Sequence, residues 1–184
     1  MQTLTSRAAR AAALLASFAI LAGPTLPVHG QESAQTLATA ATPTFTSTQL
    51  AILALINQAR AVPRNCGTTR YPAVAPLALN AQLNQASQAH AQDMATNNYF
   101  SHTSRDGTSP WTRIQRTGYS YRYAAENIAA GYSTNALVVQ GWLNSAGHCR
   151  NIMNGNLKDL GVGYAYSSTA RYHHYWVTDF ASPR

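Results

Sequence analysis

Apolar positions along the first half of the chain recur at the period of an α-helix. Thr46 and Gln49 have the spacing of a capping box, in which each side chain bonds the other residue's backbone amide. After this cap, apolar side chains return every three or four positions, at Leu50, Leu53 and Ile56. The pattern predicts a helix that ends near Ala61, just before Pro63.

Three more helices are predicted downstream. Asn80 is a favourable N-cap for a longer helix whose small and apolar positions form one stripe: Leu83, Ala86, Ser87, His90, Ala91 and Met94. A short helix is predicted from Ser109-Pro110, with proline at its first position, to Gly118. A fourth helix, capped by Ser133 or Thr134, runs through Leu137, Val138 and Trp142.

The C-terminal part of the chain changes character. Segments 162–166 and 172–180 are rich in aromatic and β-branched residues, which favours two strands joined by a polar turn. Because helices and strands share one stretch of this length, the predicted fold class is α+β, in a single ordered domain over residues 46–184.

The N-terminal residues have the order of a secretory signal peptide. A basic start with Arg7 and Arg10 precedes the apolar run 11–23, and a small-residue cleavage site lies at 28–30. We therefore expect a signal peptide over residues 1–30, followed by a flexible Ala/Thr-rich leader over 31–45. The apolar run is too short to span a bilayer, so the expected location is secreted, extracellular or periplasmic, with no transmembrane segment.

Composition excludes several classes of function. Only 10% of the 184 residues are charged, against about 25% in typical soluble domains, and the net charge is +7. The bases are scattered rather than clustered with aromatic residues, so nucleic-acid binding is not expected. Because the chain has no glycine-rich phosphate loop, a nucleotide-dependent enzyme is not expected either.

If the protein is secreted, its two cysteines are expected to be oxidised rather than free. In an oxidising compartment Cys66 and Cys149 are expected to form a disulfide, since only one intramolecular pairing exists. The alternative is a pair of free thiols, one of them catalytic.

Candidate chemistry lies in three segments, 99–102, 125–129 and 142–152, each expected at a helix end or in a loop. They contribute His102, Glu126 and His148. Two imidazoles and a carboxylate can form an open zinc site, or a general base whose orientation a carboxylate holds. Spacing alone leaves a third alternative open, a buried polar network that tethers loops.

Other polar residues are assigned simpler roles. His90 lies on the apolar stripe of its helix and is expected to be a hydrogen-bonded core histidine. His173 and His174 are adjacent in a predicted strand, so they point to opposite faces and cannot chelate one ion together. Ser101 and Ser145 neighbour the candidate histidines, but neither lies in a GxSxG nucleophile elbow.

The same segments, together with others, resemble a known family in order and in spacing. The pieces are 55–60, 76–80, 90–94, 99–102, 106–107, 118–119, 126–131, 142–152, 161–163 and 175–176. Over residues 48–181 the chain resembles a CAP domain, the superfamily of cysteine-rich secretory proteins, antigen 5 and pathogenesis-related proteins, and above all its short secreted bacterial branch. The resemblance implies a three-layer α-β-α sandwich.

The resemblance also implies a cleft in which two histidines and two glutamates hold a divalent metal. Matched residue by residue, these are His102, His148 and Glu126, while Ser145 stands where the second glutamate would be. Loss of one carboxylate weakens affinity for hard cations such as calcium, so zinc is the expected cofactor, weakly bound.

The expected function is that of a secreted CAP-domain protein, monomeric and non-enzymatic. The resemblance implies that it binds a small apolar or lipid-like ligand, or a partner on a cell surface. The alternative is a hydrolase of peptides or esters, with His102 or His148 as general base and Glu126 orienting it. Ser101, Ser145 or a metal-bound water would then be the nucleophile. A third hypothesis is a structural module without cleft chemistry.

Overall fold

Helices and strands alternate through residues 43–184, the part of the chain that this computed structural model describes. The predicted signal peptide 1–30 and most of the predicted leader 31–45 lie outside the described residues. The helices are α1 (Ser47–Arg60), α2 (Ala81–Thr96), α3 (Pro110–Arg116), α4 (Asn135–Asn144) and α5 (Ala146–Ile152). The first four confirm the helices that the apolar pattern predicts.

The N-termini of α1 to α4 are capped as the sequence predicts. The Thr46 hydroxyl accepts the Gln49 amide at 3.2 Å, and the Gln49 side chain accepts the Thr46 amide at 2.9 Å. Asn80 accepts two backbone amides at the start of α2, and Thr134 caps α4. Each cap satisfies amides that have no partner within the helix.

One four-stranded sheet forms the centre of the domain, in the order β3-β5-β6-β4. Its strands are β3 (Ala78–Leu79), β4 (Tyr121–Ala130), β5 (Asp159–Tyr166) and β6 (His174–Pro183). The β5–β6 and β6–β4 pairs are antiparallel, whereas β3 runs parallel to β5. β4 is therefore an edge strand of this sheet.

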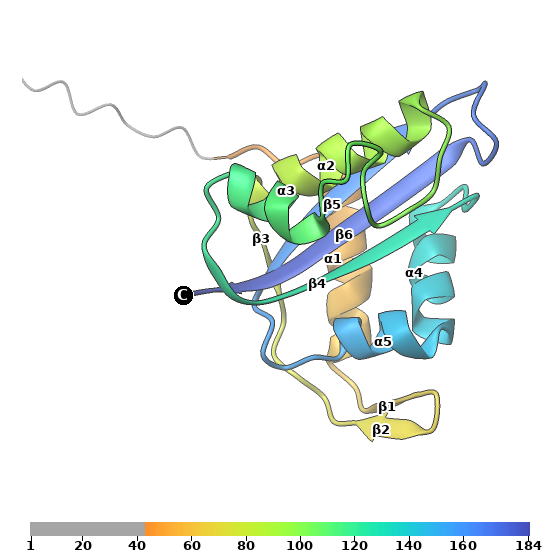
Figure 1. Cartoon of the computed structure of the whole chain (residues 1–184). Coiled ribbons are helices and arrows are strands. Elements are labelled where there is room, and N and C mark those ends of the chain that lie inside the picture. The colour runs from red at the N-terminus through yellow and green to blue at the C-terminus, as the bar shows by residue number, and fades with distance from the viewer. Residues whose placement is uncertain (1–42) are drawn as a thin grey trace, which may run out of the picture. The chain divides into compact units, whose positions relative to one another are not determined.

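Helices cover both faces of the sheet (Figure 1). On one face α1, α4 and α5 bury Ile52, Trp142 and Phe180 in the larger core cluster. On the other, α2 packs on the sheet through Met94 and Val177. The arrangement is the three-layer α-β-α sandwich that the resemblance implies.

α2 lies unusually close to β5 because two glycines face it. A Cβ built at Gly161 would overlap the backbone of Leu83, and one at Gly163 would overlap the backbone of Ser87. The contact partners are backbone atoms of a helix, which cannot rotate away as a flexible side chain can. The spacing between these two layers therefore depends on glycine at both positions.

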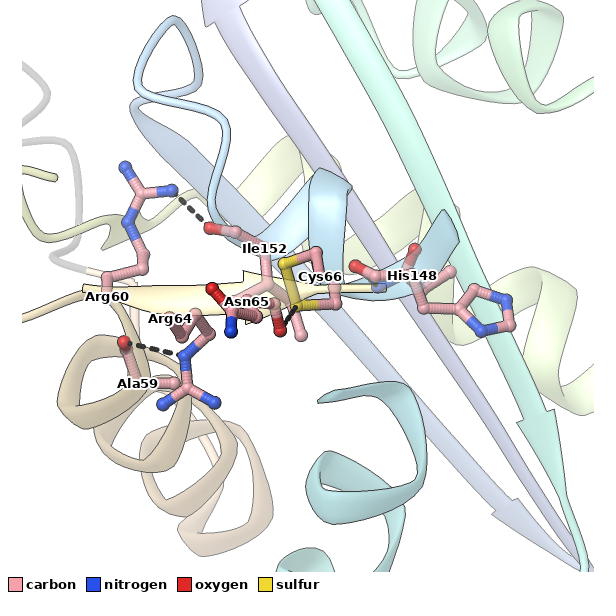
Figure 2. The surroundings of a disulfide bond; sticks show 9 residues. Ala59, Arg60, Arg64, Asn65, Cys66, His148 and Ile152 are labelled. Carbon is pink, nitrogen blue, oxygen red and sulfur yellow. Dashed lines mark hydrogen bonds between the residues drawn. A yellow bond between two sulfur atoms is a disulfide. The ribbon is translucent and has the colours of Figure 1, made fainter. Parts of the chain in front are cut away.

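A covalent link joins the small hairpin β1 (Arg64–Cys66) and β2 (Thr69–Tyr71) to α5. Cys66 and Cys149 form a disulfide with a Cα–Cα distance of 5.4 Å, which confirms the predicted pairing and excludes two free thiols (Figure 2). Beside it, the fully buried Arg60 donates hydrogen bonds to four backbone carbonyls, those of Ala75, Ile152, Asn154 and Leu157. The disulfide holds α5, and the hydrogen bonds of Arg60 hold the end of α5 and the segment that follows it.

Two sequence-based expectations are wrong. His173 does not lie in a strand: β6 begins at His174, and His173 lies in the preceding turn with a positive φ of 60°. Glu126 is not at a helix end or in a loop but in the middle of β4, a strand that the sequence reasoning missed. None of the helices within residues 43–184 has the length and apolar character needed to cross a membrane.

Candidate functional site

Glu126 is fixed in place by the sheet. It lies directly opposite Asp179 in the β4–β6 register, and its side chain is only 1% exposed. Burial, and then the charge of Glu126, raises the pKa of Asp179 well above its usual range. Asp179 is thereby shifted toward its neutral form and accepts a hydrogen bond from Ser87 at 2.7 Å. Glu126 is the acidic partner of the nearby basic side chains His102 and Arg113.

A chain of three side chains runs from the interior to the surface. The guanidinium of Arg113 donates to Glu126 Oε2 at 2.6 Å, and His102 Nδ1 bonds Glu126 Oε1 at 2.7 Å. Because a carboxylate accepts, His102 Nδ1 carries the proton, which leaves Nε2 free for a ligand when the ring is neutral. The His102 side chain is 50% exposed, so this nitrogen is within reach of solvent.

Arg113 also fixes the loop that carries His102. It donates to the His102 carbonyl at 2.9 Å, to Ser104 Oγ at 3.1 Å and to the Thr108 carbonyl at 3.2 Å. Sequence reasoning missed this residue and counted it among the scattered bases. The sequence contained a signal for its burial: Arg113 lies three residues after Pro110, on the same side of α3, and both are buried together with Ile114.

His148 approaches the same place from α5. Burial, and next the charge of His102, lowers its pKa, so the neutral imidazole dominates at pH 7. Its carbonyl accepts a hydrogen bond from Asn127 at 3.2 Å, which ties α5 to β4. The side chain points away from the disulfide at the neighbouring Cys149 (Figure 2).

The two histidines meet in a cleft along the edge strand β4. His102, His148, Phe100, Ser101 and Ile128 line a hollow of about 400 Å³. A second hollow of about 290 Å³ shares Phe100, Ile128 and His148 with it, and is otherwise lined by Ala129, Ala130, Tyr132, Gly141, Trp142, Ser145 and Tyr172. The structure thus brings His102, Glu126 and His148 together, as the sequence predicts.

The two candidate nucleophiles lie at the walls of these hollows without an activating contact. Ser145 is the N-cap residue of α5, but its side chain makes no capping hydrogen bond. Ser101 Oγ accepts the backbone amide of Thr103 at 3.1 Å. Within residues 43–184 no hydrogen bond joins either hydroxyl to His102 or His148.

The donor set fits a zinc ion only in part. Both oxygens of Glu126 are engaged, one by His102 and the other by Arg113. Glu126 therefore has the position of a carboxylate behind a histidine ligand, which orients the ring and raises its basicity. No group of three His, Cys, Asp or Glu side chains ready to hold a metal occurs in the described residues. His102 and His148 are the available donors.

Three further histidines of the described residues, His90, His173 and His174, lie apart from the cleft. His90 is buried and donates Nε2–H to the Ser101 carbonyl at 2.8 Å, which confirms its predicted role as a hydrogen-bonded core histidine. His174 Nδ1 bonds the Tyr164 hydroxyl at 2.9 Å, and His173 Nδ1 lies 3.1 Å from the Ser167 carbonyl. Both therefore have structural partners at the β5–β6 turn.

Residues 53–180, more than half of the chain, match the family model described as CAP, the cysteine-rich secretory protein family. The chain belongs to the CAP family. It is 43% identical over 94 residues to the uncharacterized protein YkwD of Bacillus subtilis (strain 168), a stretch that covers 51% of this chain and 37% of YkwD.

Solved CAP structures agree with the fold. An extracellular SCP-domain protein of Bacillus anthracis is 29% identical to this chain, with a TM-score of 0.59. The match covers 76% of this chain and 45% of the Bacillus anthracis protein. Venom allergen-like protein 4 of Schistosoma mansoni is 13% identical, with a TM-score of 0.54 over 76% of this chain and 91% of its own, and supports the fold alone. The chain spans less than half the length of YkwD and of the Bacillus anthracis protein.

Within this CAP domain, one departure from the family pattern bears on metal binding. Ser145 stands where the resemblance places a second glutamate, and it lines the cleft beside His148. A hydroxyl there supplies no negative charge to a cation. The metal-binding role of His102, Glu126 and His148 stays a prediction.

Proposed function

We propose that this CAP-domain protein is secreted and acts without catalysis, holding a small ligand that has an apolar body and a polar end. One observation carries the proposal: the apolar hollow against Phe100, Ile128 and Trp142 opens directly onto His148 and His102. Ligand sites in proteins combine such mostly apolar walls with a few placed polar groups.

Secretion is supported by three observations. The sequence predicts a signal peptide over 1–30, and the Cys66–Cys149 disulfide persists under oxidising conditions. Two proteins of similar fold are described as an extracellular protein of Bacillus anthracis and an outer surface protein of Borrelia burgdorferi.

The polar end of the ligand would meet two imidazoles. Glu126 fixes the His102 ring so that Nε2 is free, and the lowered pKa of His148 favours a free nitrogen lone pair there as well. These groups suit a ligand hydroxyl or amine, or a weakly held zinc ion with His102 and His148 as donors. Zinc, when bound, would supply a positive charge for a polar ligand group.

A neutral probe tests the apolar wall. N-phenyl-1-naphthylamine becomes fluorescent when an apolar site takes it up, and its affinity would be measured for the wild type and two variants. Phe100 and Trp111 are 44% and 42% exposed, but only Phe100 lines the cleft. We expect Phe100→Ala to weaken binding about tenfold, from the loss of one aromatic contact, and Trp111→Ala to leave it unchanged. Equal effects of the two variants would refute the proposed site.

Zinc binding is tested separately by native mass spectrometry. We expect one added zinc in the wild type, its loss in His102→Ala and in His148→Ala, and its retention in His173→Ala. Retention in both cleft variants would show that the two histidines are not the donors. The denatured mass of the secreted protein also reports the cleavage site and the disulfide.

A hydrolase remains the second candidate, because the His102–Glu126 pair has the geometry of an oriented general base. We would assay p-nitrophenyl acetate and fluorescein-labelled casein. Turnover that disappears in His102→Ala or His148→Ala, with the fold intact, would establish catalysis and overturn the non-enzymatic proposal. Variants that change only stability, with no probe or zinc bound by the wild type, would instead indicate a structural module.

A further inference from the structure

A further cavity lies outside the cleft. It has a volume of about 570 Å³ and is bounded by α2, by the loop 104–108 and by α3, which lie on the same face of the sheet (Figure 1). None of its lining residues also lines the two cleft hollows. Its volume is within the range of small-molecule sites.

Charged side chains line the cavity. Arg105, Arg113 and Arg116 line it, against the two acids Asp93 and Asp106. Both acids are engaged locally: Asp106 accepts the Thr108 amide at 2.8 Å, and Asp93 accepts from Tyr99 and from Asn97. Neither acid is thereby directed at an arginine.

The arginines at the rim form no close ion pair within residues 43–184, although Asp106 lies near enough to Arg116 for their charges to interact. In the described part of the chain no carboxylate lies within ion-pair distance of Arg105 or Arg116, and both are exposed. Arg116 reaches across to Thr108, whose hydroxyl accepts from Nη1 at 3.2 Å. Two guanidinium groups therefore remain available to an anion at the mouth of the cavity.

Arg113, which lines the cavity, contains a buried donor without a partner in the described residues. Arg113 is 9% exposed, and its four Nη hydrogens have acceptors at Glu126, His102, Ser104 and Thr108. Its Nε is buried, with no acceptor among residues 43–184. A buried N–H without a partner is unfavourable. Because Arg113 Nε has no accessible surface, an anionic oxygen in the cavity would accept from it only after the side chain shifts toward the cavity.

His90 adds a neutral acceptor beside this donor. Its Nε2 donates to the Ser101 carbonyl, and burial followed by the charge of Arg113 lowers its pKa. Its Nδ1 is 3.5 Å from Ser104 Oγ, at the limit of a hydrogen bond. A ligand N–H or O–H can therefore be accepted here, next to the group that the arginines hold.

We propose that this cavity binds a small organic anion, whose carboxylate or phosphate group lies among Arg105, Arg113 and Arg116. A hydrogen-bond donor on the body of the ligand would face His90. The site is independent of the cleft, but Arg113 joins the two, because it contacts Glu126 on one side and lines the cavity on the other.

The test follows arginine Nε–H signals by NMR while inorganic phosphate or acetate is added at constant ionic strength. We expect saturable shifts of the Arg113 signal, with dissociation constants in the millimolar range because each probe is only a fragment of a ligand. The stronger of the two probes identifies the anionic group. Arg113 itself is left unchanged, since its removal would disturb the His102 loop.

Variants with equal change of net charge separate this site from general surface attraction. Arg105→Gln and Arg116→Gln should each weaken binding about tenfold, the loss of one charge-assisted contact. Arg122→Gln, an exposed position on β4 away from the cavity, should have no effect. Shifts that do not saturate, or an equal loss in Arg122→Gln, would overturn the proposal. Phe100→Ala and His148→Ala should bind the anion normally, so failure of the cleft proposal would not affect this result.

Discussion

Replacement of Arg60 by methionine should be among the most destabilising single changes in the domain. Arg60 is 0% exposed and has no carboxylate partner within residues 43–184. Its guanidinium instead holds four carbonyls from two separate segments, Ala75 and the stretch 152–157, at distances of 2.6 to 3.2 Å. Methionine fills a similar volume but supplies no donor.

The magnitude follows from these contacts. Four charge-assisted hydrogen bonds at about 1.5 kcal/mol each, the low end of their usual range, sum to roughly 6 kcal/mol. Desolvation of the guanidinium, which lowers the pKa of Arg60 to about 10, offsets part of this stabilisation. We therefore expect Arg60→Met to lower the free energy of unfolding by about 3–4 kcal/mol. Arg60→Lys should lower it by about 2 kcal/mol, because an ammonium cannot reproduce the planar fork.

Urea unfolding at pH 7 measures both effects, provided that the slope against urea is unchanged. Arg64→Met is the matched control, because Arg64 is only partly buried and donates a single side-chain hydrogen bond, to the Ala59 carbonyl at 3.2 Å (Figure 2). It should cost less than about 1 kcal/mol. Equal losses for Arg60→Met and Arg64→Met would refute the reasoning that the four carbonyls depend on one guanidinium.

Three further changes test other parts of the fold. Serine at both Cys66 and Cys149 should lower stability by about 4–5 kcal/mol on the loop-entropy model for 83 residues, as measured by thermal unfolding against the oxidised wild type. Gly163→Ala should cost about 3 kcal/mol through overlap with α2, whereas Gly147→Ala, whose Cβ would meet nothing closer than 3.9 Å, should not destabilise. Burial lowers the pKa of His90 in the folded state, so protonation of His90 favours unfolding. The free energy of unfolding should therefore fall as the pH drops below about 6.5, and it should fall less in His90→Gln. Urea midpoints measured at about pH 7.5 and about pH 5 test this.

The helices were predictable from sequence because their signals are local. A cap such as Thr46, together with an apolar repeat over the next turns, defines α1 without reference to any other part of the chain. The stripe on α2 did the same, and it also identified His90 as a core residue. The aromatic runs predicted β5 and β6 to within a few residues at their ends.

β4 could not be predicted, because its stability is not local. Its alternation of aromatic, alanine and polar residues shows no clear period, and it is a strand because it pairs with β6 from Tyr121 to Ala130. The short helix α5 was missed for a related reason, since a disulfide and contacts to β4 hold it. In the cleft, the histidines and Glu126 were found from motif resemblance. Arg113 was missed because an arginine in the sequence does not show which carboxylate it pairs with in the fold, here Glu126.

The disulfide beside His148 has a consequence for when the cleft becomes complete. Glu126 and Arg113 are positioned by strand pairing and burial, which need no covalent chemistry. α5 is only seven residues long and is attached to the β1–β2 hairpin through Cys149. In a reducing compartment we therefore expect a chain with an intact sheet but a loosely held His148. Oxidation would be the maturation step that brings the second histidine to the first, so the cleft would assemble only after the chain has reached an oxidising environment.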